Sequence, residues 1–324
     1  MSRTDQRRIP WLVVSLLLVI GAPAAAKRIE LDNGDVYEGE IVDDMRTGQG
    51  LYIWADGHRY EGEFQANRMQ GEGTYFWPDG RTYQGAFVAD QRQGQGTLRW
   101  PNGDVYEGGF RANKMHGTGT FVWANQDRYS GEFADGKRTG RGEFIWGTGE
   151  RYVGEFVDGV LSGEGTFEWP DGRRYVGPFV AGRKTGRGVF EWANGNRYVG
   201  DFSDDARSGL GVFYWRDGTV YQGQFVNDQM HGYGVKEAPD GAMQVQHWEG
   251  GALSFSKVLS ANPRCTLQLQ DRTWMFDSTD CINGLAHGSG MAASLDGQRI
   301  VVDGQFVLGN LVKGEIQDLR LGES

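Results

Sequence analysis

Histidine and serine side chains, the usual carriers of acid–base and nucleophilic chemistry, occur in this sequence without a recognisable catalytic arrangement. Of the five histidines, His58 lies in a predicted turn, His247 is isolated, and three sit in predicted turns of a repeated pattern, namely His116, His231 and His287. No Gly-x-Ser-x-Gly motif occurs, which would place a nucleophilic serine on a strand-to-helix turn. The Gly-x-Gly pairs lack the third glycine and the helix of a dinucleotide-binding loop. The sequence therefore predicts a protein that is not an enzyme and that holds no cofactor or metal ion.

The two cysteines, Cys265 and Cys281, have 15 residues between them. Two cysteines without a nearby histidine or second cysteine pair fit poorly to the four ligands of a structural zinc site. In an exported protein the default for such a pair is a disulfide, which contributes on the order of 3 kcal/mol for a loop of this size. We therefore expect a disulfide between Cys265 and Cys281.

The aromatic side chains belong to a repeat of 23 residues. Tyrosine returns at this interval nine times, from Tyr37 to Tyr221, and tryptophan keeps the same step eight times. The nine units occupy residues 37–243 without an insertion, and the ninth is degenerate because Ala238 replaces the tryptophan. A fixed period of this length is typical of proteins in which successive units stack on one another.

Within a unit, the alternation of residue types predicts two β-strands. Counted from the tyrosine as position 1, apolar or small residues occupy positions 1, 3 and 5, and again positions 12, 14, 16 and 18. This period of two is typical of strands with one buried face. Asp-Gly or Asn-Gly at positions 20 and 21 favours a tight turn with positive φ angles, and a looser turn is expected across positions 7 to 12. Each unit is therefore expected to be a β-hairpin.

Glycine recurs inside the predicted strands, where it normally costs stability. We expect each strand glycine to leave room for an aromatic ring, so that tyrosine, phenylalanine and tryptophan pack across strands over glycine. A single hairpin cannot bury this aromatic row, whereas stacked hairpins can. The predicted fold is therefore all-β, an elongated single-layer antiparallel sheet of stacked hairpins. The predicted core of two representative units consists of Tyr60, Phe64, Trp77, Tyr83, Phe87 and Trp100.

The pattern Tyr-x-Gly-x-Phe, followed by Gly-x-Gly and Asp-Gly at a spacing of 23 residues, resembles the MORN (membrane occupation and recognition nexus) repeat. The resemblance covers about two-thirds of the chain and is specific, because many fixed positions recur in every unit. The His-Gly pair that family units often carry at positions 11 and 12 occurs here only at His116-Gly117 and His231-Gly232. The resemblance implies a scaffold, a dimerisation surface or a membrane-associated module.

The residues before the repeats have the character of an export signal. Residues 1–26 carry three arginines, then an apolar run from Trp11 to Ile20, then small residues up to Ala26. This is the pattern of a secretory signal peptide, and an apolar run of about a dozen residues is too short to span a bilayer. We expect cleavage near Ala26 and export from a bacterial cytoplasm to the periplasm or the medium.

The segments that flank the repeats are expected to cap the sheet. Residues 27–36 have the pattern of the second half of a unit, and residues 244–324 keep fragments of the repeat without its strict period. Degenerate terminal units are expected in repeat proteins because an open sheet edge invites aggregation. We expect an N-terminal half-repeat and a C-terminal β cap that contains the disulfide.

Charged residues follow columns of the repeat. The net charge of −10 argues against nucleic acid as a partner. Two interpretations of the basic columns remain open, because cross-strand pairing with acidic neighbours and a ladder for an extended anionic ligand both fit. Position 23 carries Arg59, Arg128, Arg151, Arg174 and Arg197. The candidate ligand ladder is position 10, with Arg46, Arg92, Arg138, Lys184 and Arg207.

These features predict a non-catalytic binding or scaffold protein of the bacterial cell envelope. Its partner is expected to be a protein of unknown identity or a membrane surface. A glycan- or lipid-binding module is the alternative, since exposed aromatic rings stack on sugars and a basic ladder attracts anionic headgroups. Self-association is a third class, for which a homodimer is the commonest outcome.

Overall fold

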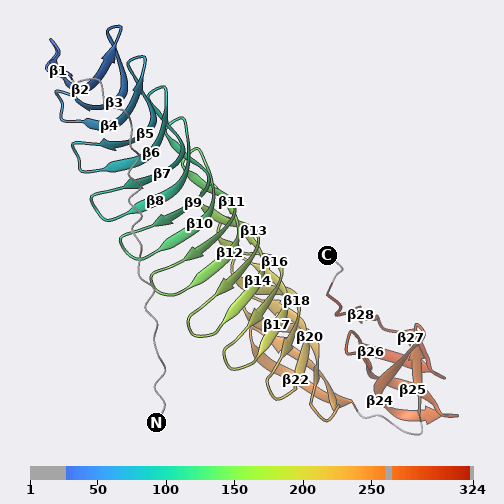
Figure 1. Ribbon diagram of the computed structural model, residues 1–324. Helices are drawn as coiled ribbons and strands as arrows, with labels where there is room; N and C mark the ends of the chain where they lie inside the picture. Colours follow the sequence, from blue (N-terminus) through green and yellow to red (C-terminus); the bar gives the residue numbers. More distant parts are fainter. Residues whose placement is uncertain (1–26, 260–264, 322–324) are drawn as a thin grey trace, which may run out of the picture. The chain divides into compact units, whose positions relative to one another are not determined.

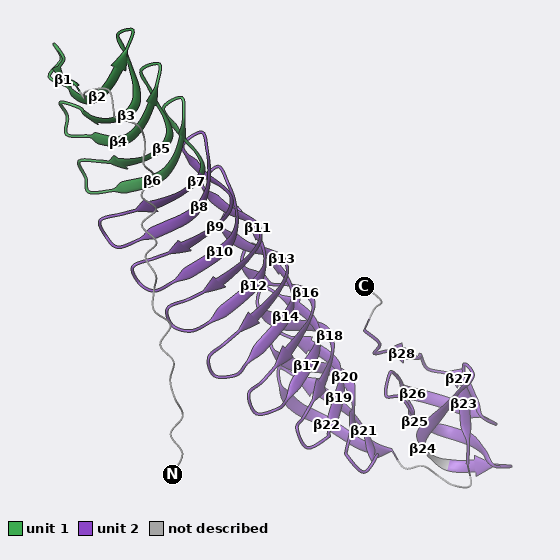
Figure 2. Cartoon of the chain, viewed as in Figure 1, with its two compact units in different colours: residues 1–94 green, residues 95–324 purple. Residues whose placement is uncertain are grey.

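The computed structural model describes residues 27–259 and 265–321, so the predicted signal peptide lies outside the described residues. All elements in this part of the chain are β-strands, β1 to β28, and no helix there could cross a bilayer. The chain divides into two compact units, Met1–Gly94 and Gln95–Ser324 (Figure 2). Within each unit the strands form stacked antiparallel hairpins, which confirms the all-β prediction.

In the first unit, each strand pairs with its neighbours in sequence (Figure 1). The boundary between the units falls inside β7 (Gln91–Arg99). The strands before it are β1 (Lys27–Glu30), β2 (Val36–Val42), β3 (Met45–Ile53), β4 (Arg59–Gln65), β5 (Arg68–Phe76) and β6 (Thr82–Val88).

In the second unit, the same hairpin stacking continues to Leu259. The strands are β8 (Val105–Arg111), β9 (Lys114–Val122), β10 (Arg128–Ala134), β11 (Lys137–Ile145), β12 (Arg151–Val157), β13 (Val160–Glu168), β14 (Arg174–Val180), β15 (Arg183–Lys184), β16 (Gly186–Glu191), β17 (Arg197–Ser203), β18 (Ala206–Tyr214), β19 (Val220–Val226), β20 (Gln229–Glu237), β21 (Met243–Glu249) and β22 (Ala252–Leu259).

The two strands of a unit are joined by a two-residue turn. In the hairpin of β4 and β5, Ala66 and Asn67 at positions 7 and 8 have φ angles of 49° and 69°. Every unit has Asp, Asn or Gly at position 8, the residues that tolerate this left-handed conformation best. The prediction of a loose turn across positions 7 to 12 was therefore wrong. The strand resumes at position 9, and Gly71 at position 12 lies in a bulge of β5, where the register with β4 shifts between Gly62 and Phe64.

Glycine is required in the strands because a tyrosine ring lies over it. In β10 the Tyr129 hydroxyl donates to the carbonyl oxygen of Glu132 at 3.0 Å, so the ring extends along its own strand. A Cβ atom at Gly131 would lie 2.6 Å from the Tyr129 oxygen, and one at Gly142 would lie 2.5 Å from the ring. Gly131 and Gly142 are directly opposite each other on β10 and β11. Each tyrosine thus covers a pair of glycines, as the recurrence of glycine predicted.

The predicted core residues are buried to different extents. Tyr60, Phe64, Tyr83 and Phe87 are buried, and the phenylalanine and tyrosine rings pack in T-shaped pairs. Phe87, for example, contacts Tyr60 at a centroid distance of 5.0 Å and an interplanar angle of 80°. The tryptophans of this set, such as Trp77, are only half-buried, because position 18 follows the end of the second strand and leads into the turn.

The residues after the repeats divide into two parts. The hairpin of β21 and β22 continues the repeat sheet, and a second sheet of six strands follows. One face of this second sheet covers a core around Trp274, Phe276 and Phe306. Its strands are β23 (Leu267–Leu269), β24 (Arg272–Ile282), β25 (Leu285–Ser294), β26 (Arg299–Val307), β27 (Asn310–Lys313) and β28 (Gln317–Asp318).

The other face of the second sheet packs on the end of the repeats. Ile300 and Val302 share a buried cluster with Val235, Met243 and Val245. These three repeat residues project from the face of the sheet opposite to the tyrosines, because they alternate with the aromatic positions along β20 and β21. The second sheet therefore covers the last units on their non-aromatic face.

The expected disulfide between Cys265 and Cys281 is present, with the two Cα atoms 5.7 Å apart. It ties the residues before β23 to the end of β24. Replacing both cysteines with serine is expected to destabilise the second sheet by about 3 kcal/mol, since the unfolded loop regains its freedom. Differential scanning calorimetry tests this prediction, with reduced wild-type protein as the control. An unchanged transition for the second sheet would contradict it.

Candidate binding surface

The sheet of each unit has two faces of different character. We call the face that carries the tyrosines the aromatic face. We call the opposite face, with the side chains of positions 2, 4, 13, 15, 17 and 23, the groove face, because three pockets lie on it. The bulge in a hairpin bends the strands, as at Gly140 and Arg141 in β11, opposite Gly131 and Glu132 of β10. The same glycines that make room for the tyrosine rings on the aromatic face form the bottom of the pockets on the groove face.

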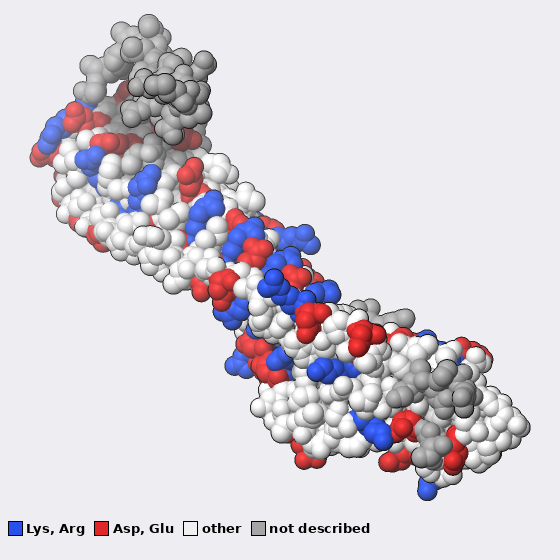
Figure 3. Space-filling model, turned by 90° about the horizontal axis from the view of Figure 1, so that it is seen from below, with Lys and Arg blue, Asp and Glu red and all other residues white. Residues whose placement is uncertain are grey.

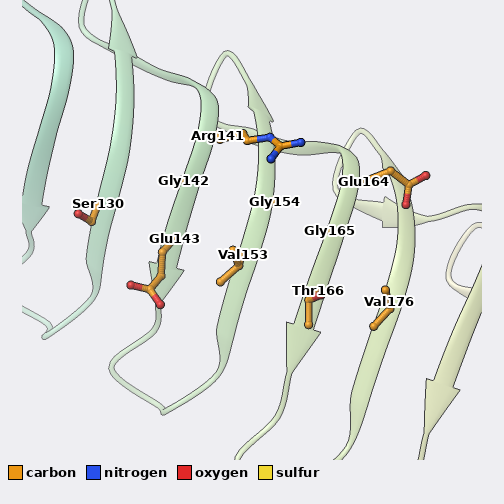
Figure 4. A pocket seen from close by; sticks show the side chains of 10 residues that line it. All are labelled: Ser130, Arg141, Gly142, Glu143, Val153, Gly154, Glu164, Gly165, Thr166 and Val176. Carbon is orange, nitrogen blue, oxygen red and sulfur yellow. The ribbon is translucent and has the colours of Figure 1, made fainter.

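The pocket between β10 and β14 has a volume of about 490 Å³. Its floor is the backbone of Gly142, Gly154 and Gly165, which are paired across neighbouring strands. Figure 4 shows Arg141 and Glu164 on one side of these glycines. The other side carries Ser130, Glu143, Val153, Thr166 and Val176. An elongated ligand lying over the glycines would therefore meet charged groups on one side and a mixed polar and apolar row on the other.

Pockets with the same construction recur at other repeats. One in the first compact unit, residues 1–94, has a volume of about 630 Å³ and is acidic, with Glu38, Glu61 and Glu72 among its lining residues. Another in the second unit has a volume of about 630 Å³ and is lined by Gln95, Glu107 and the threonines of β9, among others. The groove face therefore keeps one shape while its chemistry changes from unit to unit.

A family model provides the comparison that matters most. The MORN repeat model matches nine segments of the chain, which together cover more than half of it. This chain belongs to the MORN repeat family. The number of repeats agrees with the nine predicted from the tyrosine spacing. The matched segments are residues 37–59, 60–80, 83–105, 106–128, 129–151, 152–173, 175–197, 198–220 and 221–243.

Other comparisons add no functional information. No curated protein matches the chain. The TCP domain of Drosophila melanogaster SAS-4 (dCPAP), solved with a proline-rich motif of Ana2 (dSTIL), is 17% identical over 48% of this chain and 85% of that chain, with a TM-score of 0.32. An inactive virginiamycin B lyase from Staphylococcus aureus, solved with quinupristin, is 10% identical over 83% and 91% of the two chains, with a TM-score of 0.13. Neither likeness is close enough to support an argument.

On the groove face of the MORN repeats, the arginines of position 23 form cross-strand ion pairs. Arg151 binds Glu143 at 2.7 Å and Glu168 at 2.8 Å, and these hydrogen bonds raise the pKa of its guanidinium. The pairs continue on both sides, so that basic and acidic groups alternate along the column. On the face of the molecule that Figure 3 shows, basic and acidic side chains are likewise intermixed. These ion pairs agree with the first interpretation of the position-23 arginines, in which they pair with acidic neighbours across strands. The alternating residues are Arg128, Glu143, Arg151, Glu168, Arg174, Glu191 and Arg197.

The candidate ligand ladder of position 10 lies on the aromatic face of the MORN repeats. Each cationic group lies over aromatic rings, at 4.5 to 5.6 Å from the nearest centroid in the contacts of Arg46, Arg92, Arg138, Lys184 and Arg207. Burial lowers the pKa of Arg92 and Arg138. The side chains of Lys184 and Arg207 are only 16% and 18% exposed.

Several of these cations also hold the turn of the next unit. Arg46, Arg138 and Arg207 each donate from Nη2 to a turn carbonyl oxygen, at 2.8, 2.8 and 2.6 Å respectively. The acceptor belongs to the residue at position 8 of the following hairpin, for example Asn67. The column therefore links successive hairpins and covers their rings, which leaves the groove face as the more open surface for a ligand.

Two of the described histidines, His58 and His247, lie beside groups that could take part in acid–base chemistry, but neither has the arrangement of a catalytic triad. Ser254 Oγ lies 2.8 Å from His247 Nδ1, and Glu249 Oε1 lies 3.8 Å from the same nitrogen. A triad needs the serine and the acid on opposite ring nitrogens. The Tyr75 hydroxyl lies 2.8 Å from His58 Nδ1. Over residues 27–259 and 265–321, no group of three potential metal ligands comes together.

Sequence reasoning singled out the arginines of position 23 on the groove face but missed the pocket residues at positions 2, 13 and 15. Arg141, Val153, Glu164 and Thr166 drew no attention because the fixed positions of the repeat, rather than the variable ones, stood out. A signal was available in the comparison of units with one another, since positions 2 and 13 change type along the chain while the framework stays constant. Variable positions that share one face of a constant scaffold are typical of a binding surface.

Proposed function

We propose that this MORN-repeat protein is a non-catalytic scaffold that holds an extended segment of a partner protein along its groove face. The observation that carries the proposal is the recurrence of pockets over paired glycine backbone. Repeat proteins use such extended surfaces to contact an elongated partner at several units at once. A partner segment over Gly154 would meet Arg141 and Glu164 on one side and Val153 and Val176 on the other.

The basic residues of positions 10 and 23 already have partners within the protein, which supports a ligand site over the glycines instead. The cations of position 10 bind rings and turns. The arginines of position 23 are paired with glutamates. Neither column therefore presents an open row of positive charge to a lipid or glycan.

We propose in addition that the protein works in the bacterial cell envelope, after export. The signal-like residues 1–26 support this location, as does the disulfide of Cys265 and Cys281, because disulfides persist in oxidising compartments. Amino-terminal sequencing of the mature protein tests it, since Lys27 is the expected first residue. An intact Met1 would contradict it.

A glycan-binding function is the second candidate, and one observation favours it. In the second compact unit, residues 95–324, the tryptophans of the repeats alternate with phenylalanines in an unbroken ladder. The centroid distances are, for example, 4.4 Å between Phe121 and Trp123 and 5.4 Å between Trp123 and Phe144. These tryptophans are half-buried, so part of each ring is open to stacking on a sugar.

Substitution on the groove face tests the scaffold. Val153→Arg places a long side chain in the pocket and is expected to lower capture of the partner from envelope extracts by at least about tenfold, because that side chain occupies the space over Gly154 that the partner would fill. Val180→Arg is the matched control, since Val180 is exposed at the end of β14 outside the pocket. Equal capture by both variants would contradict the proposal. Capture of a glycan in place of a protein would favour the second candidate.

A further inference from the structure

The last strand of the repeat sheet, β22, has a free edge. It pairs antiparallel with β21, and no register with another strand of the described residues involves it. Its residues from Ala252 to Val258 are all exposed, and only Leu259 is buried. By contrast, the neighbouring β21 buries Met243, Val245 and Gln246. The backbone groups on the outer edge of β22 are therefore open to a further strand.

The sequence of β22 does not protect this edge. Proteins blunt edge strands by keeping them short and placing charges on them, and β1 does so with four residues, of which Lys27, Arg28 and Glu30 are charged. β22 is eight residues long and its single charge is Lys257. Leu253, Phe255 and Val258 are 48%, 38% and 53% exposed. A long apolar edge of this kind is a template for pairing with another chain.

A pocket lies directly beside this edge. It has a volume of about 570 Å³ and is formed by Phe255 and Lys257 of β22 together with residues of β24 to β27 in the second sheet. This volume is within the range of about 300–1,000 Å³ that is typical of ligand sites. Because Phe255 and Lys257 lie on one face of β22, an added strand would direct every second side chain toward the same pocket.

The charges in the pocket are balanced. Lys257 Nζ binds Asp277 Oδ2 at 2.8 Å, and the two other charged residues of the lining, Asp303 and Lys313, have opposite signs. Apolar contact is offered by Phe255 and also by Met291 and Val302 of the second sheet. A charged side chain would have to be desolvated without net compensation, so the pocket is suited to an uncharged apolar one.

We propose that an extended peptide segment of a partner protein adds to β22 as a further strand and inserts an uncharged apolar side chain beside Phe255. Strand addition obtains its affinity from main-chain hydrogen bonds and its specificity from pockets for alternate side chains. The intervening side chains of the peptide lie next to Ser254 and Ser256 on the other face. This site is separate from the groove over Gly154, and neither proposal depends on the other.

A library of random nonapeptides displayed on phage, selected against the full chain, tests the proposal. The enriched peptides are expected to have uncharged apolar residues at alternate positions. Phe255→Asp brings a second carboxylate close to Asp277 and is expected to weaken binding of a selected synthetic peptide by at least about tenfold. Phe255→Leu keeps an apolar contact and is expected to weaken binding less than Phe255→Asp does. Val180→Asp changes an exposed residue of the repeats far along the chain and is expected to stay within about twofold of the wild type.

Two further measurements separate strand addition from other modes of binding. Hydrogen exchange of the Ala252–Leu259 amides is expected to slow when the peptide is added, and methylation of alternate peptide amides is expected to abolish binding, because it removes main-chain donors. The proposal is overturned if no peptide is enriched, if Phe255→Asp binds as well as the wild type, or if the methylated peptide still binds. If these amides become more protected from exchange when the protein concentration is raised without peptide, the proposal is also overturned, since a second copy of the chain would then occupy β22. Circular dichroism of each variant verifies that it is folded.

Discussion

Replacing Gly131 with alanine is expected to destabilise the protein by about 3 kcal/mol or more, at the upper end of the range for an overpacked core. The added Cβ atom would lie 2.6 Å from the Tyr129 oxygen and also 2.6 Å from the Cα atom of Gly142 on the next strand. The ring cannot relieve the second contact by moving, because it is a contact with backbone. The two strands would have to separate, and the hydrogen bond from Tyr129 to Glu132 would be lost.

Urea unfolding followed by far-ultraviolet circular dichroism measures this effect. Ser130→Ala is the matched control, because Ser130 is the adjacent residue and projects from the opposite face into a pocket. Its change is expected to stay within about 0.5 kcal/mol, as for most surface substitutions. A loss for Gly131→Ala as small as that of the control would mean that the glycines are not required by the tyrosine rings.

Raising the pH above 10 is expected to unfold the repeats cooperatively. Burial raises the pKa of Tyr83, Tyr106, Tyr129 and Tyr152 to about 12, whereas a tyrosine in an unfolded chain ionises near pH 10. The neutral phenol is therefore favoured in the folded state. The stability that this preference contributes is fully present below about pH 10 and is lost as the pH rises toward 12. Because the same tyrosine recurs in every unit, the losses add along the chain.

A titration that records tyrosinate absorbance and circular dichroism together tests this prediction. The two signals are expected to change in the same pH interval, since the buried hydroxyls ionise only when the strands open. The same titration in concentrated denaturant is the control and is expected to show ionisation near pH 10. Ionisation of the whole tyrosine population near pH 10 with the sheet signal intact would show that the rings are accessible in the folded protein.

Most local features of the repeats could be predicted correctly from the sequence. The two-residue alternation around Tyr60 and Phe64 indicated strands with one buried face, and the strand glycines indicated rings packed over them. Both inferences depend on residues a few positions apart. The turn at Ala66 and Asn67 was placed too loosely, because the position-12 glycine was attributed to the turn and in the structure belongs to a bulge in the strand.

The sequence alone determined the period, the hairpin, the aromatic face and the number of units, because each is encoded within one repeat and then copied. Only the tertiary structure decided which surface is left open. Arg46 reaches the turn at Asn67 in the following unit, and Gln222 donates to the carbonyl oxygen of Leu319, 97 residues away. Such contacts depend on the stacking of hairpins and on the docking of the second sheet. The groove over Gly154 and the free edge of β22 are consequences of the same stacking, because they are the backbone surfaces that it leaves uncovered.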